Sequence, residues 1–199
     1  MALSRRRLMI VGLGPLGLAA CDWVGKGAAF KAVDITGANY ANGFDLSDAD
    51  GQRRQLTDFA GKVTVVFFGF THCPDVCPTT LLELAAAKKA LGPDGARVQG
   101  VFITIDPERD TPALLKAYVD NFGAGFVALR GTPDETKAVA KSFKVFYAKV
   151  SGSTETSYSM DHTAGSYIFD TQGKVRLFTR YGTGAEALTH DLKILLAKG

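Results

Sequence analysis

Residues 63–78 read VTVVFFGFTHCPDVCP, and this stretch decides the fold. Its first eight residues are almost continuously apolar and rich in β-branched and aromatic side chains, which predicts a strand that is buried on both faces. Residues 79–91 are rich in Leu, Ala, Glu and Lys, and Gly92-Pro93 follows them, so they are predicted to form a helix. Cys73 and Cys77 therefore lie between the carboxyl end of a buried strand and the amino end of a helix.

The rest of the chain alternates predicted strands with predicted helices. A turn at residues 48–51, between residues 44–46 and 54–56, predicts an N-terminal β-hairpin. Thr111-Pro112 and Thr132-Pro133 predict two helix starts. This order predicts an α/β fold in which helices flank a central mixed β-sheet. Further strands are expected at residues 98–105, 126–129, 145–150, 166–169 and 175–181, and helices at residues 111–122, 132–143 and 185–197.

The N-terminal segment has the layout of a secretory signal. Arginines at residues 5–7 precede an uncharged stretch at residues 8–20, which is shorter than the roughly 20 apolar residues of a membrane-spanning helix. Leu18-Ala19-Ala20-Cys21 resembles the lipobox of bacterial lipoproteins, in which Cys21 would become the lipidated first residue. The alternative is a simple cleaved signal or an uncleaved anchor. The arginines also fit a twin-arginine signal, so both Sec and Tat export stay open.

This layout divides the chain into three expected parts. They are a lipoprotein-type signal peptide at residues 1–20, a tether at residues 21–40 and one domain at residues 41–199. Asp22 resembles the signal that retains such lipoproteins at the bacterial inner membrane, so we expect a lipid-anchored domain that faces the periplasm. The G-x-G-x-x-G run at residues 12–17 is rejected as a dinucleotide site, because it follows no strand and lies in the signal segment.

The charge of the mature chain argues against nucleic acid as a partner. The full chain has 23 Lys and Arg and 20 Asp and Glu, and residues 1–20 contain three of the arginines and no acidic residue. The mature chain is then left with 23 − 3 = 20 basic and 20 acidic side chains. Binding to nucleic acid depends on clustered basic charge, so we expect none.

The cysteine count indicates a functional thiol pair. If Cys21 is lipidated, Cys73 and Cys77 remain as one pair in an exported protein. A disulfide between residues four positions apart closes a loop too small to stabilise a domain of this size. The helix start after the pair is expected to favour a thiolate and to lower its pKa.

Two thiols and an imidazole are a ligand set suited to copper. Thiolates select Cu(I), and imidazole binds either oxidation state. Structural zinc normally has four protein ligands, whereas only Cys73, Cys77 and the distant His162 are evident. On its spacing alone, His162 could equally be a surface imidazole, and the thiols could instead be a redox couple. His72 is expected to point away from the thiols, and His190 to lie on a solvated helix face.

Three signatures resemble those of the Sco/SenC family. They are residues 68–78, residues 105–112 and Asp161-His162-Thr163, and the similarity extends over residues 35–197. The strand, thiol pair and helix also resemble the arrangement of thioredoxin-like proteins, although three residues rather than two separate the cysteines here. The resemblance implies a thioredoxin-like fold, a membrane-anchored periplasmic domain and delivery of copper to the dinuclear copper site of cytochrome c oxidase.

By the same resemblance, Cys73, Cys77 and His162 are the expected ligands of copper, as Cu(I), Cu(II) or both. The expected partners are the copper-accepting subunit of the oxidase, other periplasmic copper or thiol-redox proteins, and the membrane through the lipid anchor. Asp161 could hold an imidazole N–H of His162, although neighbouring residues in a strand point to opposite faces.

Other functions remain open beside this metallochaperone, which is not itself an enzyme. A thiol-disulfide oxidoreductase would use Cys73 and Cys77 as its redox-active pair to reduce the copper-binding cysteines of the target. A redox or copper sensor would use the same ligands. A peroxidase of the peroxiredoxin class would require an Arg beside its active cysteine, and none lies near Cys73 in the sequence.

Overall fold

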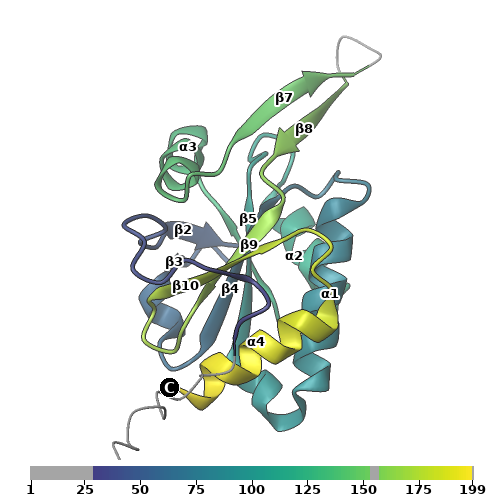
Figure 1. The fold of residues 1–199 in the computed structure, drawn as a ribbon. Helices are drawn as coiled ribbons and strands as arrows, with labels where there is room; N and C mark the ends of the chain where they lie inside the picture. The colour runs from purple at the N-terminus through teal and green to yellow at the C-terminus, as the bar shows by residue number, and fades with distance from the viewer. Residues whose placement is uncertain (1–28, 153–156, 199) are drawn as a thin grey trace, which may run out of the picture.

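The buried strand predicted at residues 63–70 is β4, Val63–Gly69, at the centre of the main sheet. The computed structural model describes residues 29–152 and 157–198 (Figure 1). All residues of β4 are buried. Parallel β5, Val98–Thr104, lies on one side of β4, and antiparallel β9, Gly165–Phe169, lies on the other. The strand that leads to the cysteines is therefore held along both edges.

The main sheet has eight strands in the order β1-β10-β9-β4-β5-β6-β2-β3. Its centre, β4-β5-β6, is parallel, and every other pairing is antiparallel, which confirms the predicted mixed sheet. The predicted N-terminal hairpin is also confirmed, and it extends the sheet because β2 pairs with β6. The remaining strands are β1 (Val33–Asp34), β2 (Asp45–Asp48), β3 (Arg53–Gln55), β6 (Val127–Arg130) and β10 (Val175–Arg180).

The helices flank the sheet as predicted, with one difference that affects the thiols. Helix α1 spans Val76–Ala90 and begins three residues before the predicted start at residue 79, so Cys77 lies in its first turn. Pro78 fits there because the first turn of a helix does not require its backbone N–H. The other helices are α2 (Pro112–Asp120), α3 (Pro133–Ser142) and α4 (Ala185–Ala197), with short 3-10 helices η1 (Leu56–Phe59) and η2 (Gly92–Arg97).

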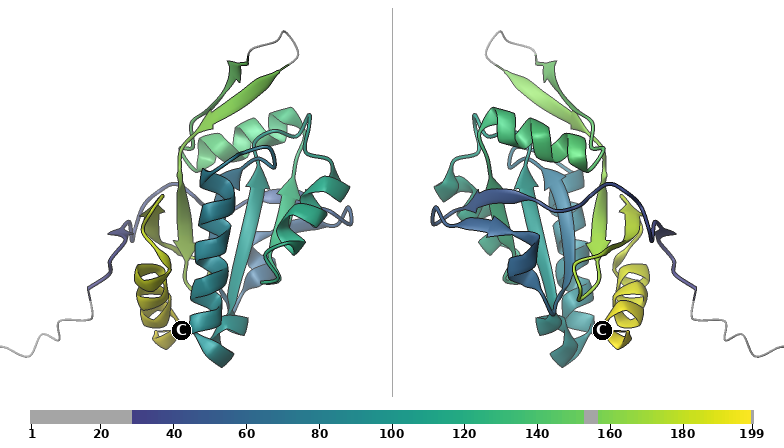
Figure 2. Two further views of the ribbon diagram at one scale, coloured as in Figure 1. Left: turned by 90° about the vertical axis from the view of Figure 1, so that its right-hand side faces the viewer. Right: turned by 90° about the vertical axis from the view of Figure 1, so that its left-hand side faces the viewer.

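The neighbouring phenylalanines Phe67 and Phe68 of β4 pack on opposite faces of the sheet. The ring of Phe67 contacts Phe102, which in turn contacts Tyr118 of α2, at centroid distances of 6.1 and 5.5 Å. The ring of Phe68 contacts Phe143 at the end of α3, at 5.1 Å. Helices α1 and α4 pack together (Figure 2). Alternation along β4 thus explains why the strand is apolar at nearly every position.

A separate two-stranded sheet projects from this core (Figures 1 and 2). It consists of β7, Tyr147–Ser151, and β8, Tyr158–His162, which pair antiparallel. The strand predicted at residues 145–150 is therefore present, but it does not join the main sheet, and β8 was not predicted. The alternation of Tyr158, Met160 and His162 is the sequence signal that could have identified β8.

The folded unit begins before residue 41. The backbone N–H groups of Lys31 and Ala32 donate to the fully buried carboxylate of Asp191 at 2.7–3.1 Å, and β1 pairs with β10. Part of the segment predicted as a tether is thus attached to the domain. The predicted signal peptide and Cys21 lie outside the described residues. Within residues 29–152 and 157–198, no helix is both long and apolar enough to span a bilayer.

Candidate metal centre

The thiols lie where β4 turns into α1. The N–H of Cys73 donates to the carbonyl of Phe70 at 3.2 Å, which closes a turn, and the N–H of Cys77 points at Cys73 Sγ at 3.5 Å. Cys77 is fully buried, whereas Cys73 is partly exposed, and they form no disulfide. Gly69 leaves room for the Cys77 sulfur to lie against β4, because a Cβ at this position would lie 2.8 Å from Cys77 Sγ.

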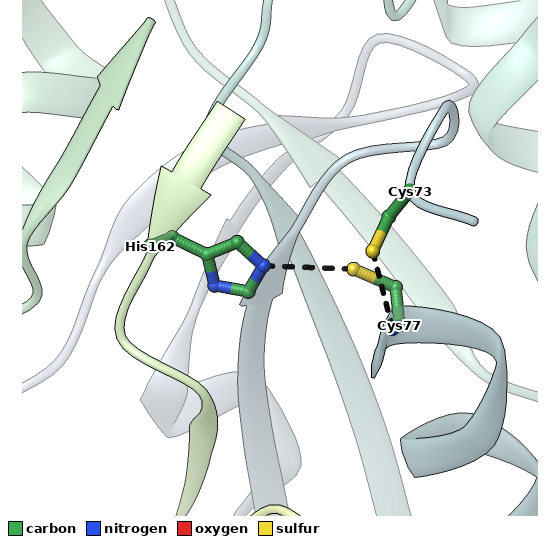
Figure 3. A group of neighbouring side chains, drawn as sticks. All are labelled: Cys73, Cys77 and His162. Atoms are coloured by element: carbon green, nitrogen blue, oxygen red, sulfur yellow. Dashed lines mark hydrogen bonds between the residues drawn. The ribbon is translucent and has the colours of Figure 1, made fainter. Parts of the chain in front are cut away.

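His162 reaches the thiols from the end of β8 (Figure 3). Its Nε2 is 3.7 Å from Cys77 Sγ. The two sulfurs and one imidazole nitrogen all lie within 4.8 Å of one another, and they are the only His, Cys, Asp or Glu group of this kind among the described residues. The structure therefore brings together the three residues that the sequence predicts as copper ligands.

A backbone carbonyl holds the imidazole of His162 in orientation. The Nδ1 atom lies 3.0 Å from the carbonyl oxygen of Thr163, which can only accept a hydrogen bond. Nδ1 therefore carries a proton, and the lone pair of Nε2 in the neutral ring faces the thiols, which is the tautomer that a metal ligand requires. Asp161 does not provide this contact, because its side chain is exposed on the other face of β8.

The two thiols differ in acidity because they share a proton. The hydrogen bond from the Cys77 thiol lowers the pKa of Cys73 to about 4, with smaller contributions from the side chain of His162 and the backbone N–H of Cys77, while burial opposes them. The same hydrogen bond, together with burial, raises the pKa of Cys77. The pair is thus a partly exposed thiolate at Cys73, which precedes α1, beside a buried thiol at Cys77 in the first turn of α1.

Aromatic rings line the imidazole. The rings of Phe67 and Phe70 lie edge-on to the His162 ring at centroid distances of 6.0 and 6.1 Å. Both phenylalanines are buried. They restrict the access of water to one side of the thiol-imidazole group and limit the orientations that the imidazole can adopt.

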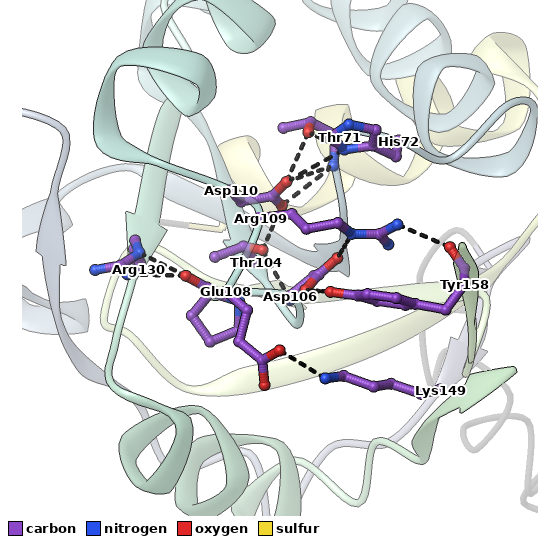
Figure 4. A network of polar contacts seen from close by, with 11 residues as sticks. Thr71, His72, Thr104, Asp106, Glu108, Arg109, Asp110, Arg130, Lys149 and Tyr158 are labelled. Atoms are coloured by element: carbon purple, nitrogen blue, oxygen red, sulfur yellow. Dashed lines mark hydrogen bonds and ion pairs between the residues drawn. The ribbon is translucent and has the colours of Figure 1, made fainter. Parts of the chain in front are cut away.

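Asp110 lies directly before the predicted helix start at Thr111 and binds Thr71, in the loop that carries Cys73 (Figure 4). Its fully buried carboxylate accepts hydrogen bonds from the Thr71 N–H at 3.1 Å, the Thr71 hydroxyl at 2.6 Å and the Thr104 hydroxyl at 2.5 Å. His72 lies 3.9 Å from this carboxylate and is outside the thiol-imidazole group, as predicted. His190 is on α4, beside Asp191.

One proton is expected on the thiol pair at neutral pH. Thiolate absorbance and the rate of alkylation by iodoacetamide should both fall as the pH drops through about 4, because Cys73 takes up a proton there. Cys77→Ala removes the thiol that donates to Cys73 and should move this midpoint toward the ordinary value of 9.0. A midpoint near 9.0 in the unsubstituted protein would contradict the assigned asymmetry.

Known proteins resemble this chain in sequence and in fold. Residues 33–197 match the family model described as SCO1/SenC. The "SCO2-like protein" of Rickettsia felis is 36% identical over 169 residues, which cover 83% of this chain and 82% of the relative. The copper-bound structure of Bradyrhizobium japonicum ScoI is 40% identical, with a TM-score of 0.70, and the match covers 77% of this chain and 98% of that one.

A third similarity concerns the fold alone. BsSco, described as a member of the Sco family of cytochrome c oxidase assembly proteins and as containing a disulfide switch, is 21% identical with a TM-score of 0.63. The match covers 84% of this chain and 99% of BsSco. These structures confirm the predicted thioredoxin-like fold. Relatives of this fold carry copper, and the chain presents a Cys-Cys-His group that can bind it. The chain belongs to the SCO1/SenC family.

Proposed function

We propose that this protein is a copper metallochaperone in which Cys73, Cys77 and His162 bind the metal. The observation that carries the proposal is the convergence of two sulfurs and one imidazole nitrogen within 4.8 Å from segments 85 residues apart. Thiolates and imidazole suit copper better than they suit hard cations. The copper carried by the Bradyrhizobium japonicum relative supports the same assignment.

The exposure of the ligands suits transfer of the metal. Cys77 is fully buried, but Cys73 and His162 are partly exposed, so an incoming ligand can approach from their side. Three ligands leave the coordination shell of copper open to a further donor. A partner's thiol or imidazole can therefore displace the ligands of this chain one at a time, without release of free copper.

The proposed acceptor is the subunit of cytochrome c oxidase that holds the dinuclear copper site. The description of BsSco as part of a family of cytochrome c oxidase assembly proteins supports this partner. Residues 1–20 are proposed to be a lipoprotein-type signal peptide and Cys21 the lipidated residue, followed by a tether. The domain would then be held at the inner membrane, facing the periplasm, where the oxidase is assembled.

One observation favours a second function, thiol-disulfide exchange. A partly exposed thiolate at Cys73 can attack a disulfide, and the buried thiol of Cys77 can then resolve the mixed disulfide that forms. Such a reductase would keep the copper-binding cysteines of the target reduced. It requires the two thiols but not His162.

Copper binding separates the two functions. Cu(I) binding should weaken by about 100-fold in each of Cys73→Ser, Cys77→Ser and His162→Ala. Loss of a ligand should lower the metal affinity at least as much as loss of a group that orients the ligand. His190→Ala is the matched control and should change the affinity by less than about 2-fold. Competition with a chromogenic Cu(I) chelator measures all four variants. Unchanged copper binding in His162→Ala, together with rapid disulfide exchange, would instead favour the reductase.

The lipid anchor has its own test. In bacterial cells that express the full chain, radioactive palmitate should label the protein, and the protein should be found in the membrane fraction. Cys21→Ala should abolish the label, because the acylated atom is the Cys21 sulfur or the amine that its processing exposes. Equal labelling of the wild type and the variant would contradict lipidation at this residue.

A further inference from the structure

The strand that ends at His162 belongs to a sheet that does not pair with the main sheet. β8 pairs only with β7 among the described strands, so no backbone ladder holds β8 itself to the main sheet. The nearest ladder to β4 is that of β9, which begins three residues after His162. Phe67 and Phe70 contact the imidazole ring but do not hold the strand. Other contacts must position this projecting sheet.

Tyr158, four residues before His162 on β8, is bound by the loop at residues 106–110 (Figure 4). Its hydroxyl donates to Asp106 Oδ1 at 2.9 Å. Arg109 Nη1 donates to the Tyr158 carbonyl at 2.7 Å, and the Arg109 guanidinium lies 3.6 Å from the centre of the Tyr158 ring. The loop therefore holds both the backbone and the side chain of this residue.

The loop itself is well anchored. Asp106 is buried, its carboxylate pairs with Arg109 Nε, and its N–H donates to the Thr104 hydroxyl at 3.0 Å. The N–H groups of Arg109 and Asp110 both donate to the Asp106 carbonyl, at 3.2 and 3.0 Å. Such a turn, closed by its own backbone and by a partly buried ion pair, resists deformation.

The same loop also contacts the segment that carries the thiols. Asp110 binds the backbone and hydroxyl of Thr71, two residues before Cys73. The Arg109 guanidinium also lies 5.9 Å from the ring of Phe70, which contacts His162. One rigid turn of five residues thus contacts the segments on both sides of the thiol-imidazole group.

We propose that residues 106–110 set the separation between His162 and the thiols, with Arg109 and Tyr158 as positioning residues of the copper site. The proposal rests on the function proposed above, and neither residue touches the metal. Groups that orient a ligand contribute about 10-fold to 100-fold to metal affinity. Arg is required at residue 109, because its planar fork binds the Tyr158 carbonyl and Asp106 while its face stacks on a ring, which Lys cannot reproduce.

Two measurements on the full reduced chain test the proposal. The first uses the metal-free protein and records nuclear Overhauser contacts between the His162 ring and the rings of Phe67 and Phe70. The second measures Cu(I) affinity by chelator competition and the imidazole nitrogen coupling of bound Cu(II) by electron paramagnetic resonance. The variants are Arg109→Ala, Arg109→Lys and Tyr158→Phe. The control is Arg53→Ala, which removes ion pairs with Asp45 and Glu135 only.

Arg109→Ala and Arg109→Lys should lose the ring contacts of His162, weaken Cu(I) binding by about 10-fold to 100-fold and reduce the nitrogen coupling. Tyr158→Phe removes one hydrogen bond but keeps the stacking, so its effect should be smaller and in the same direction. This variant keeps the test valid if Arg109→Ala leaves Asp106 unpaired and fails to fold. Arg53→Ala should behave as the wild type.

Ring contacts that persist in the Arg109 variants and in Tyr158→Phe would overturn the proposal, whatever the copper affinity. Rescue of both readouts by Arg109→Lys would overturn the role of the guanidinium fork. Failure of the wild type to bind copper would instead overturn the proposed function. Loss of the ring contacts in the metal-free variants would still support the positioning role in that case.

Discussion

The burial of Cys77 at the junction of β4 and α1 is the constraint on which the rest of the site depends. The sulfur occupies space that only a glycine at residue 69 leaves open, since a Cβ there would lie 2.8 Å from it. Its S–H has little access to water, so it donates to Cys73 and makes that residue the thiolate. The position of one buried thiol thus sets the charge of the other.

Copper binding would remove the proton that the two thiols share. A bound cation favours thiolate at both cysteines, so the proton held by Cys77 must leave as copper enters. The buried thiol therefore opposes copper binding in acid, whereas Cys73 is already deprotonated at neutral pH. In the proposed metallochaperone, such a site would bind copper in neutral solution and release it to the thiolates of a partner. The rings of Phe67 and Phe70, which contact the imidazole, limit the access of water to the metal site.

Local patterns predicted much of this structure. The apolar run of β4, the thiols that follow it and the helix start at Thr132 each depend on neighbouring residues, and all were identified from the sequence. The prediction placed the start of α1 at residue 79, where the run rich in Leu, Ala, Glu and Lys begins, whereas the helix starts three residues earlier and takes Pro78 into its first turn. The position of β1 was missed because it is set by pairing with β10 and by the bonds of Lys31 and Ala32 to Asp191, all far along the chain.

The polar support of the site could not be predicted in the same way. Asp110 binds Thr71, 39 residues away in the sequence, and Arg109 binds Tyr158, 49 residues away. The motif at residues 105–112 indicated a loop and a helix cap, which it is, but carried no sign of what its carboxylates bind. Proximity of His162 to the thiols rested on family resemblance alone until the structure placed Nε2 3.7 Å from Cys77 Sγ.

X-ray absorption at the copper edge of the loaded full chain tests the central claim most directly, since it reports the atoms bound to the metal. Two sulfur scatterers and one imidazole nitrogen per copper are expected, with the imidazole signal lost in His162→Ala. A shell of nitrogen and oxygen without sulfur would contradict the claim, as would four sulfurs shared between two chains.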